Sequence, residues 1–331
     1  MDVQDAANAA ARLRRYAIVC VLAQSALFTF AAGLVKAAAP SVPTIEIMLF
    51  RSGVALVCMW PLIRRAGGLV ALRTRRPWGH TVRIVAGTGS MFGTFYGYAT
   101  MPLATVTALG FAMPVFLSLL SVPLLGERLN VYRWVSVGAG LLGVVIVLQP
   151  WQAGGDVPMG PAAIVVLSVI AWAVAMVSIR KMGQGGERNV TIVVWFGLAA
   201  TILSAALCVP VWVTPAPAVL AGLIGVGVIS ALAQYLMTEG YRKGEATMLA
   251  PFEYGAIIYT VLMGWLIWDE VPGRWESVGI AVLVVSGLAT WWRETAIRSR
   301  QALPPAAPAA PSRPVFSGPT RSLRAPAQRP D

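Results

Sequence analysis

The sequence predicts an all-α integral membrane protein with ten transmembrane helices, arranged as two inverted five-helix repeats. Three observations support this fold class: the apolar composition, the one-sided placement of basic residues between apolar runs, and an internal repeat. The 331 residues are 57 % hydrophobic and only 12 % charged, whereas soluble domains are about a quarter charged. The composition therefore excludes an ordinary soluble protein.

Apolar runs of about 20 residues, the length that crosses a bilayer as a helix, recur along the chain between charged residues, Pro and Gly. Within the third of these runs, Gly89, Gly93 and Gly97 are spaced four residues apart, a pattern that predicts close helix packing. The ten ranges expected to be helical are 16–38, 43–63, 78–100, 103–125, 131–148, 158–179, 190–212, 218–240, 246–268 and 275–292.

Basic residues concentrate on one side of these runs. With the N-terminus in the cytoplasm, the inner segments hold 22 Lys and Arg residues and the outer loops hold two, Lys36 and Arg274. Arg51 and Arg83 lie within the runs and belong to neither group. The positive-inside rule therefore predicts a multi-pass protein of the cell (inner) membrane with both termini cytoplasmic. The same placement argues against nucleic acid as a partner, despite the net charge of +12.

The second half of the chain repeats the first. Glu127 is matched by Glu270 at an offset of 143 residues, and RWVSVG at 133–138 is matched by RWESVG at 274–279. The charge pattern places the first hexapeptide inside and the second outside, so the halves are inverted. Inverted repeats are typical of secondary transporters, whose substrate site lies between the repeats near the midplane.

These features divide the chain into four parts. A cytoplasmic N-terminus covers 1–15, a first repeat covers 16–150, a second repeat covers 158–294, and a cytoplasmic tail covers 295–331. The tail is rich in Pro and Ala and lacks apolar periodicity, which predicts disorder.

Glu253 is the only formal charge in the run 246–268. A charge at this depth costs about 3 kcal/mol on insertion scales, so Glu253 is expected to face a packed bundle or a watery cavity. Pro251 removes a backbone donor and loosens the helix there. Two interpretations stay open: contact with substrate or proton, or a protonated side chain that hydrogen-bonds a neighbouring helix.

Aligning the repeats at the same offset pairs Gly110 with Glu253 and Phe111 with Tyr254. The carboxylate is thus unique to the second half, while both halves carry an aromatic residue at the next position.

Signatures of enzymes are missing from the sequence. It has no Walker motif, HExxH, GxSxG or paired intramembrane aspartates, and its three cysteines lack metal-binding spacing. We therefore expect neither an enzyme nor a cofactor or metal. His80, beside Trp78, is expected at the membrane interface, and the pair Asp269 and Glu270 is expected to cap or solvate an outer helix end.

Several motifs occur together in this chain: IEIMLFRSG at 45–53, YATMPLATVTAL at 98–109, Pro114, LLGER at 124–128, Arg180, APFEY at 250–254 and DEVP at 269–272. In this combination the chain resembles ten-helix transporters of the drug/metabolite transporter superfamily, EamA branch. Members of this branch move amino acids, nucleotide-like metabolites, S-adenosylmethionine, sugars and drugs. They often carry Arg where Glu253 stands, so the polarity of that position differs here.

The resemblance implies a substrate cavity lined by the first, third, fourth, sixth, eighth and ninth predicted helices. Glu253 would bind a cationic or amine group, or take up a proton, and aromatic residues would stack on the substrate. The candidates for substrate binding are Gln24, Phe28, Tyr98, Phe111, Trp172, Tyr235, Glu253 and Tyr254.

The resemblance also implies an ion pair or gate on the second predicted helix, formed by Glu46 and Arg51. Glu46 is expected near the wet outer end and Arg51 about one third of the way in. They lie roughly 140° apart around the helix, so they do not form a regular i,i+4 pair. It stays open whether Arg51 gates transport or satisfies carbonyls or a partner such as Glu46 for folding.

The predicted function is secondary active transport of small organic metabolites by alternating access, either proton-coupled or by exchange. One alternative is a drug or amino-acid exporter of the same fold. Another is a multipass membrane enzyme or lipid-handling scaffold, which the inverted repeat disfavours. The expected partners are a small-molecule substrate and membrane lipids, and a homodimer is left open.

Overall fold

The computed structural model describes residues 3–65, 73–74, 76–125, 131–151, 158–243 and 246–301. All regular structure in these ranges is helical. The elements are α1 (Val3–Ala38), α2 (Thr44–Arg65), α3 (Pro77–Thr100), α4 (Leu103–Gly110), α5 (Met113–Leu125), α6 (Val131–Leu148), α7 (Met159–Gln184), α8 (Asn189–Cys208), the 3₁₀ helix η2 (Val209–Val211), α9 (Pro217–Lys243), α10 (Ala246–Glu253), α11 (Gly255–Trp268) and α12 (Arg274–Gln301).

Each of the ten predicted ranges is occupied by one helix or by two consecutive helices. α12 extends beyond the predicted end at 292, while the tail from 302 onward and Glu127 of the repeat motif lie outside the described residues. Within the described part, seven stretches are long and apolar enough to cross a membrane, which makes the chain a multi-pass membrane protein. They are Ala11–Ala38, Thr44–Pro61, Leu103–Leu124, Met159–Gln184, Thr191–Val211, Pro217–Met237 and Arg274–Arg293.

The fourth predicted helix is broken in its middle. α4 ends at Gly110, and Phe111 and Ala112 form a turn before α5 begins. Pro114 lies four residues beyond Gly110 and has no N–H to donate to its carbonyl, so the helical hydrogen-bond ladder cannot continue there.

The ninth predicted helix is broken in the same way. α10 ends at Glu253, Tyr254 forms the turn, and α11 begins at Gly255. The missing donor of Pro251 predicts a weakened helix, and the break follows three residues later. α4 and α10 have eight residues each, so the two halves break their helices at equivalent positions.

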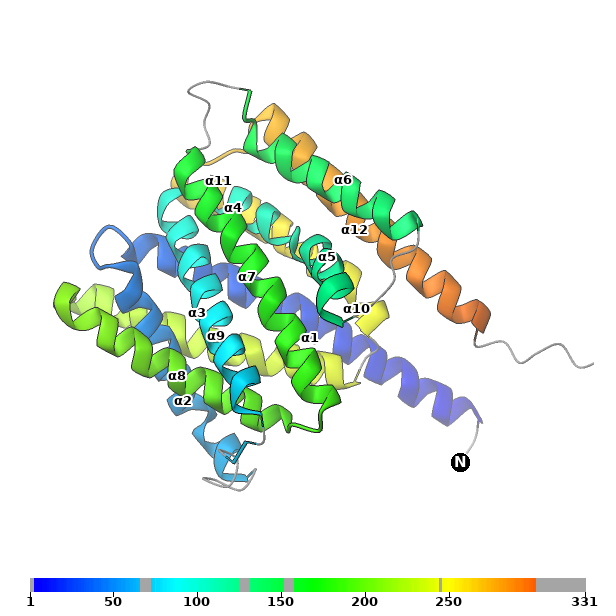
Figure 1. Cartoon of the computed structure of the whole chain (residues 1–331), viewed down its shortest axis with the longest axis horizontal. Helices are drawn as coiled ribbons and strands as arrows, with labels where there is room; N and C mark the ends of the chain where they lie inside the picture. Colours follow the sequence, from blue (N-terminus) through cyan, green and yellow to red (C-terminus); the bar gives the residue numbers. More distant parts are fainter. Residues whose placement is uncertain are drawn as a thin grey trace, which may run out of the picture.

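Helices from the first half pack mainly on helices from the second. α1 packs along α9, α3 along α7, α6 along α12 and α2 along α8. Figure 1 shows α6 and α12 side by side at one side of the molecule, and α2 and α8 at the opposite side, with the other helices between them.

The short helix α4 is buried in the middle of the largest hydrophobic cluster. Its residues Val106, Ala108 and Leu109 are at most 2 % exposed. The cluster joins α4 to α6, α7 and α12 through Val144, Val147, Val165, Val169, Ile280 and Leu283. The first helix break is therefore held by protein on several sides.

Two of the three predicted packing glycines bring α3 against α7. A Cβ added at Gly93 would lie 2.5 Å from the Cβ of Ser168, and one added at Gly97 would lie 2.5 Å from Val165 Cγ2. The packing prediction is confirmed for these two positions. The packing prediction is wrong for Gly89, because no atom of the described residues lies within 4 Å of a Cβ built there.

Candidate functional site

Phe111 and Tyr254, the aromatic residues at the two helix breaks, contact each other. Their ring centroids are 4.8 Å apart and their planes are inclined by 35°. Phe111 follows the last residue of α4 and Tyr254 precedes α11. The repeat alignment pairs these residues, so positions that are equivalent in sequence meet in the fold.

Tyr254 is placed from its other side by α12. A Cβ on Gly287 would overlap the Tyr254 phenol, so only glycine leaves room for this ring. Tyr254 is half-buried. The chain thus fixes the second aromatic residue between Phe111 and a gap on α12.

Glu253 is the last residue of α10 and is half-buried. It directly precedes Tyr254, whose ring contacts Phe111. The carboxylate therefore lies beside the aromatic pair, at the break of the helix rather than inside a continuous helix. This arrangement brings together three of the eight residues that the sequence analysis proposed for substrate binding.

On α1, the two candidates differ in their surroundings. Gln24 is 4 % exposed, and its Nε2 donates a hydrogen bond to Ser25 Oγ at 3.2 Å. Phe28, one turn further along, is half-buried.

The remaining candidates lie on α3, α7 and α9. Tyr98 packs against the cluster around α4, and its ring centroid is 6.5 Å from that of Phe95. Trp172 and Tyr235 are 42 % and 51 % exposed. A shared cavity that includes these side chains with Glu253 stays a prediction.

The sequence predicted that Glu46 on α2 lies near the solvated outer end of the helix. In the structure its side chain is instead completely buried. Its Oε2 accepts the backbone N–H of Val213 at 3.2 Å, and its Oε1 has no partner among the described residues. The prediction of a wet side chain was wrong because the segment after η2 folds over this end of α2.

Arg51 has a different partner. Its Nη1 donates to Met91 Sδ on α3 at 3.0 Å. Within the described residues, ion pairs join Lys36 to Glu270 and His80 to Glu187, so Glu46 and Arg51 are not paired in this structure. A gating role for either side chain stays a prediction.

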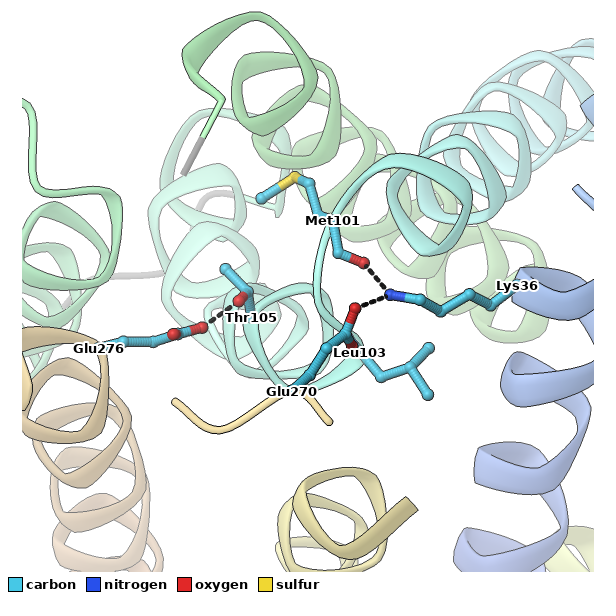
Figure 2. Close-up of polar contacts among 6 residues, drawn as sticks. All are labelled: Lys36, Met101, Leu103, Thr105, Glu270 and Glu276. Carbon is cyan, nitrogen blue, oxygen red and sulfur yellow. Dashed lines mark hydrogen bonds and ion pairs between the residues drawn. The ribbon is translucent and has the colours of Figure 1, made fainter. Parts of the chain in front are cut away.

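A polar cluster that the sequence analysis did not single out lies at one end of the bundle (Figure 2). Lys36, in the last turn of α1, forms an ion pair with Glu270 and donates to the carbonyl of Met101 at 2.9 Å. Glu270 Oε2 also accepts the N–H of Leu103 at 3.4 Å. The cluster ties the end of α1 to the start of α4 and to the link between α11 and α12.

Glu276 makes a second tie at the same end (Figure 2). Its Oε1 accepts the hydroxyl of Thr105 on α4, and its Oε2 accepts the N–H of Gly273 at 3.3 Å. Glu276 is 6 % exposed, whereas Val135, its counterpart in the repeated hexapeptide, is 64 % exposed. A carboxylate at the single position where the two hexapeptides differ was the sequence signal for this residue.

Of the two roles expected for the pair Asp269 and Glu270, the structure confirms capping at Asp269 and corrects solvation at Glu270. Asp269 follows α11 in the left-handed conformation, at φ 56°, and caps the helix. Glu270 is not a solvating residue, because both its oxygens bind the neighbouring segments.

His80 is also buried. It is 3 % exposed, and its Nε2 lies 3.4 Å from Glu187 Oε1 in the link between α7 and α8. The ring also lies 5.9 Å from that of Trp195. The first turn of α3 is thus covered by this link and by α8, while the depth of His80 relative to the membrane interface stays a prediction.

The EamA-like transporter family matches residues 15–149 and 160–291. The chain belongs to this family, within the drug/metabolite transporter superfamily, and is a transporter rather than an enzyme.

Individual relatives agree with this family. A riboflavin transporter of Rhizobium johnstonii is 32 % identical over 248 residues, which cover 74 % of this chain and 80 % of that protein. A pseudopaline exporter of Pseudomonas aeruginosa is 32 % identical over 273 residues, covering 81 % and 94 %. A protein of known crystal structure shares the fold, with a TM-score of 0.59 at 19 % identity, covering 87 % of this chain and 99 % of that one.

Proposed function

We propose that this protein is a secondary active transporter that moves a small organic solute across the cell (inner) membrane by alternating access. The observation that carries the proposal is that the family matches each half of the chain separately. Two matching halves are what a transporter built from two repeats requires. We assign the repeats to 16–150 and 158–294, with ten spans in total.

The packing supports an inverted relationship between the repeats. A twofold axis that exchanges the halves would exchange the α1–α9 contact with the α3–α7 contact, and it would keep the pairs α6–α12 and α2–α8 together. All four contacts are among the most extensive in the molecule. With both termini cytoplasmic, the end that holds Lys36 and Glu270 faces outward, and the end that holds His80 faces the cytoplasm.

Within this transporter, Glu253 would bind an amine or cationic group of the solute, or carry a proton during the cycle. Its place at the end of α10, beside the contacting rings of Phe111 and Tyr254, supports this role. Aromatic faces attract both cations and flat conjugated groups. The two rings would hold such a part of the solute next to the carboxylate.

The direction of transport follows the driving gradients rather than the fold. A relative of similar identity is named an exporter and another a transporter of riboflavin. We therefore keep export as the second candidate. Riboflavin and pseudopaline are the first solutes to examine.

The test is uptake and efflux of labelled riboflavin, pseudopaline and S-adenosylmethionine in proteoliposomes, with and without a proton gradient. We expect Glu253→Gln to abolish transport of the active solute. Asp269→Asn is the matched control, because it makes the same chemical change at an exposed cap, where Asn tolerates the left-handed conformation. Normal transport by a folded Glu253→Gln protein would remove Glu253 from the mechanism. If the wild-type protein transports neither these three solutes nor members of any other class of metabolite, the proposed function is contradicted.

A further inference from the structure

Two arginines lie within the helical bundle, and no carboxylate of the described residues forms an ion pair with either of them. Arg51 lies on α2 and Arg83 on α3, and both are half-buried. In the part of the chain that the structure describes, neither belongs to an ion pair. Charges at membrane depth are costly and usually have a partner or a function. Two unpaired cations therefore require an explanation.

The contacts that the two side chains do make are weak. Arg51 Nη1 donates to Met91 Sδ at 3.0 Å, and a thioether is a poor acceptor. The guanidinium of Arg83 lies over the ring of Phe196, 4.0 Å from its centroid. Its Nε is buried and has no hydrogen-bond partner among the described residues. Most of their N–H donors thus remain available.

Both guanidinium groups lie along one face of α3. Arg83, Gly87 and Met91 are spaced four residues apart, so they share this face. Arg83 Nη1 occupies the space where a Cβ on Gly87 would stand, and Arg51 reaches the same face at Met91.

Neighbouring helices enclose this face. Met91 belongs to a buried cluster with Met48 of α2 and Ala200 of α8, and Phe196 packs against it. The two cations are therefore held toward each other between α2, α3 and α8. Apolar surroundings strengthen the attraction of this pair for an anion.

We propose that Arg51 and Arg83 bind an oxyanion, the carboxylate or phosphate group of the transported solute. The planar guanidinium presents paired N–H donors that match two oxygens of such a group. Phe196 stacks on the flat face of Arg83 and leaves its edge donors free. The proposal rests on the proposed transport function, and it narrows the substrate to organic anions and zwitterions.

Thermal unfolding of the purified protein in an uncharged detergent tests the site without requiring transport. Tryptophan fluorescence is followed while sodium phosphate or sodium citrate replaces sodium chloride at constant ionic strength. We expect a saturable rise in melting temperature with at least one of the two oxyanions. Arg51→Gln and Arg83→Gln should each raise the half-saturating concentration by about tenfold or more, since they remove charge-assisted hydrogen bonds.

Arg83→Lys is a control for misfolding, because it keeps the positive charge and removes only the paired N–H donors of the guanidinium group. We expect it to weaken binding less than Arg83→Gln does. Arg274→Gln, at an exposed position at the start of α12, removes the same charge elsewhere and should leave binding unchanged. A melting temperature that follows ionic strength alone in the wild-type protein overturns the proposal, as does equal binding by all variants.

The phosphate of a lipid headgroup could bind the same two arginines as the oxyanion of a solute. Measurements in nanodiscs of defined lipid composition distinguish these two ligands. In discs of phosphatidylcholine alone, we expect phosphate or citrate to stabilise the wild-type protein. Arginine-dependent stabilisation that arises only when phosphatidylglycerol is added would assign the site to a lipid and overturn the solute site. Oxyanion binding by a protein that transports nothing would retain the site and contradict the proposed function. Transport that persists in both Gln variants would contradict the site alone.

Discussion

Phe111 packs against Tyr254, with ring centroids 4.8 Å apart, and each residue stands at the break of a helix in its own half of the chain. Residues that an inverted repeat makes equivalent can touch only close to the axis that relates the halves. We therefore expect this contact to lie where the two repeats move against each other during transport. Its supporting residue, Gly287, offers a direct test.

Gly287→Ala should disturb Tyr254, because the added Cβ would overlap its ring. Overpacking of this kind costs about 1–3 kcal/mol, and we expect a corresponding loss of stability in chemical denaturation together with impaired transport. Adding Tyr254→Ala should cancel much of the clash, so the two changes are non-additive.

Gly138→Ala on α6 is the matched control, since a Cβ added there meets no atom within 4 Å in the part of the chain that the structure describes. If Gly287→Ala and Gly138→Ala are equally stable, Tyr254 does not occupy the place against α12 that the structure gives it.

Lys36→Met should loosen the end of the bundle shown in Figure 2. It removes the ion pair with Glu270 and the donor to the Met101 carbonyl. The pair is partly exposed, with side-chain exposures of 12 % and 24 %, so we expect a moderate effect of roughly 1 kcal/mol. In a cysteine-free background, Ala104→Cys on α4 would then react about fivefold faster with an impermeant maleimide.

The exchanged pair, Lys36→Glu with Glu270→Lys, should restore slow labelling in part, because it restores the ion pair but neither the donor to the Met101 carbonyl nor the acceptor for the Leu103 N–H. Lys181→Met, which removes an exposed lysine from the last turn of α7, should leave the labelling rate unchanged. Equal rates in wild type and Lys36→Met would show that this ion pair does not hold the end closed.

Glu276→Val places the residue of the first hexapeptide in the second. The change leaves the hydroxyl of Thr105 and the N–H of Gly273 without their acceptor. Leaving buried polar groups unpaired costs about 1–3 kcal/mol, and we expect this loss in the free energy of unfolding.

Removing both partners should lower the free energy of unfolding by less than the sum of the losses caused by the two single substitutions. The double variant Glu276→Val with Thr105→Val replaces the two hydrogen-bonding side chains by apolar groups, which lowers the penalty for the unpaired hydroxyl. Thr100→Val is the control, because its exposed hydroxyl bonds only within its own helix, to the carbonyl of Tyr96. Strict additivity of the two single changes would contradict the contact.

The helices could be predicted from the sequence, because apolar runs act through local backbone geometry, and Pro251 predicted a weakened helix near the second break. The first break was not predicted, although the missing donor of Pro114 was visible in the sequence. The contact between Lys36 and Glu270 could not be predicted, since 234 residues separate them and periodicity does not tell which helix ends meet. The same reason explains His80 and Glu46. Glu46 was placed by its distance from a helix end and His80 by its neighbour Trp78, but links from elsewhere in the chain cover both side chains.

Gly93→Ala should separate α3 from α7. The new Cβ would lie 2.5 Å from the Cβ of Ser168 and 3.0 Å from the carbonyl oxygen of Ile164. Backbone cannot rotate away as a flexible side chain does, so the helices must shift, at a cost of about 1–3 kcal/mol. We expect a lower melting temperature and slower transport.

Gly89→Ala, one turn earlier on the same helix, is the matched control. Its added Cβ has open space within 4 Å among the described residues, and alanine favours a helix over glycine by about 0.5–1 kcal/mol. The two substitutions should therefore move the melting temperature in opposite directions, down for Gly93→Ala and up for Gly89→Ala. A rise for both would mean that α3 and α7 are free to separate at Gly93, and the close approach of these helices would then play no part in the stability of the transporter.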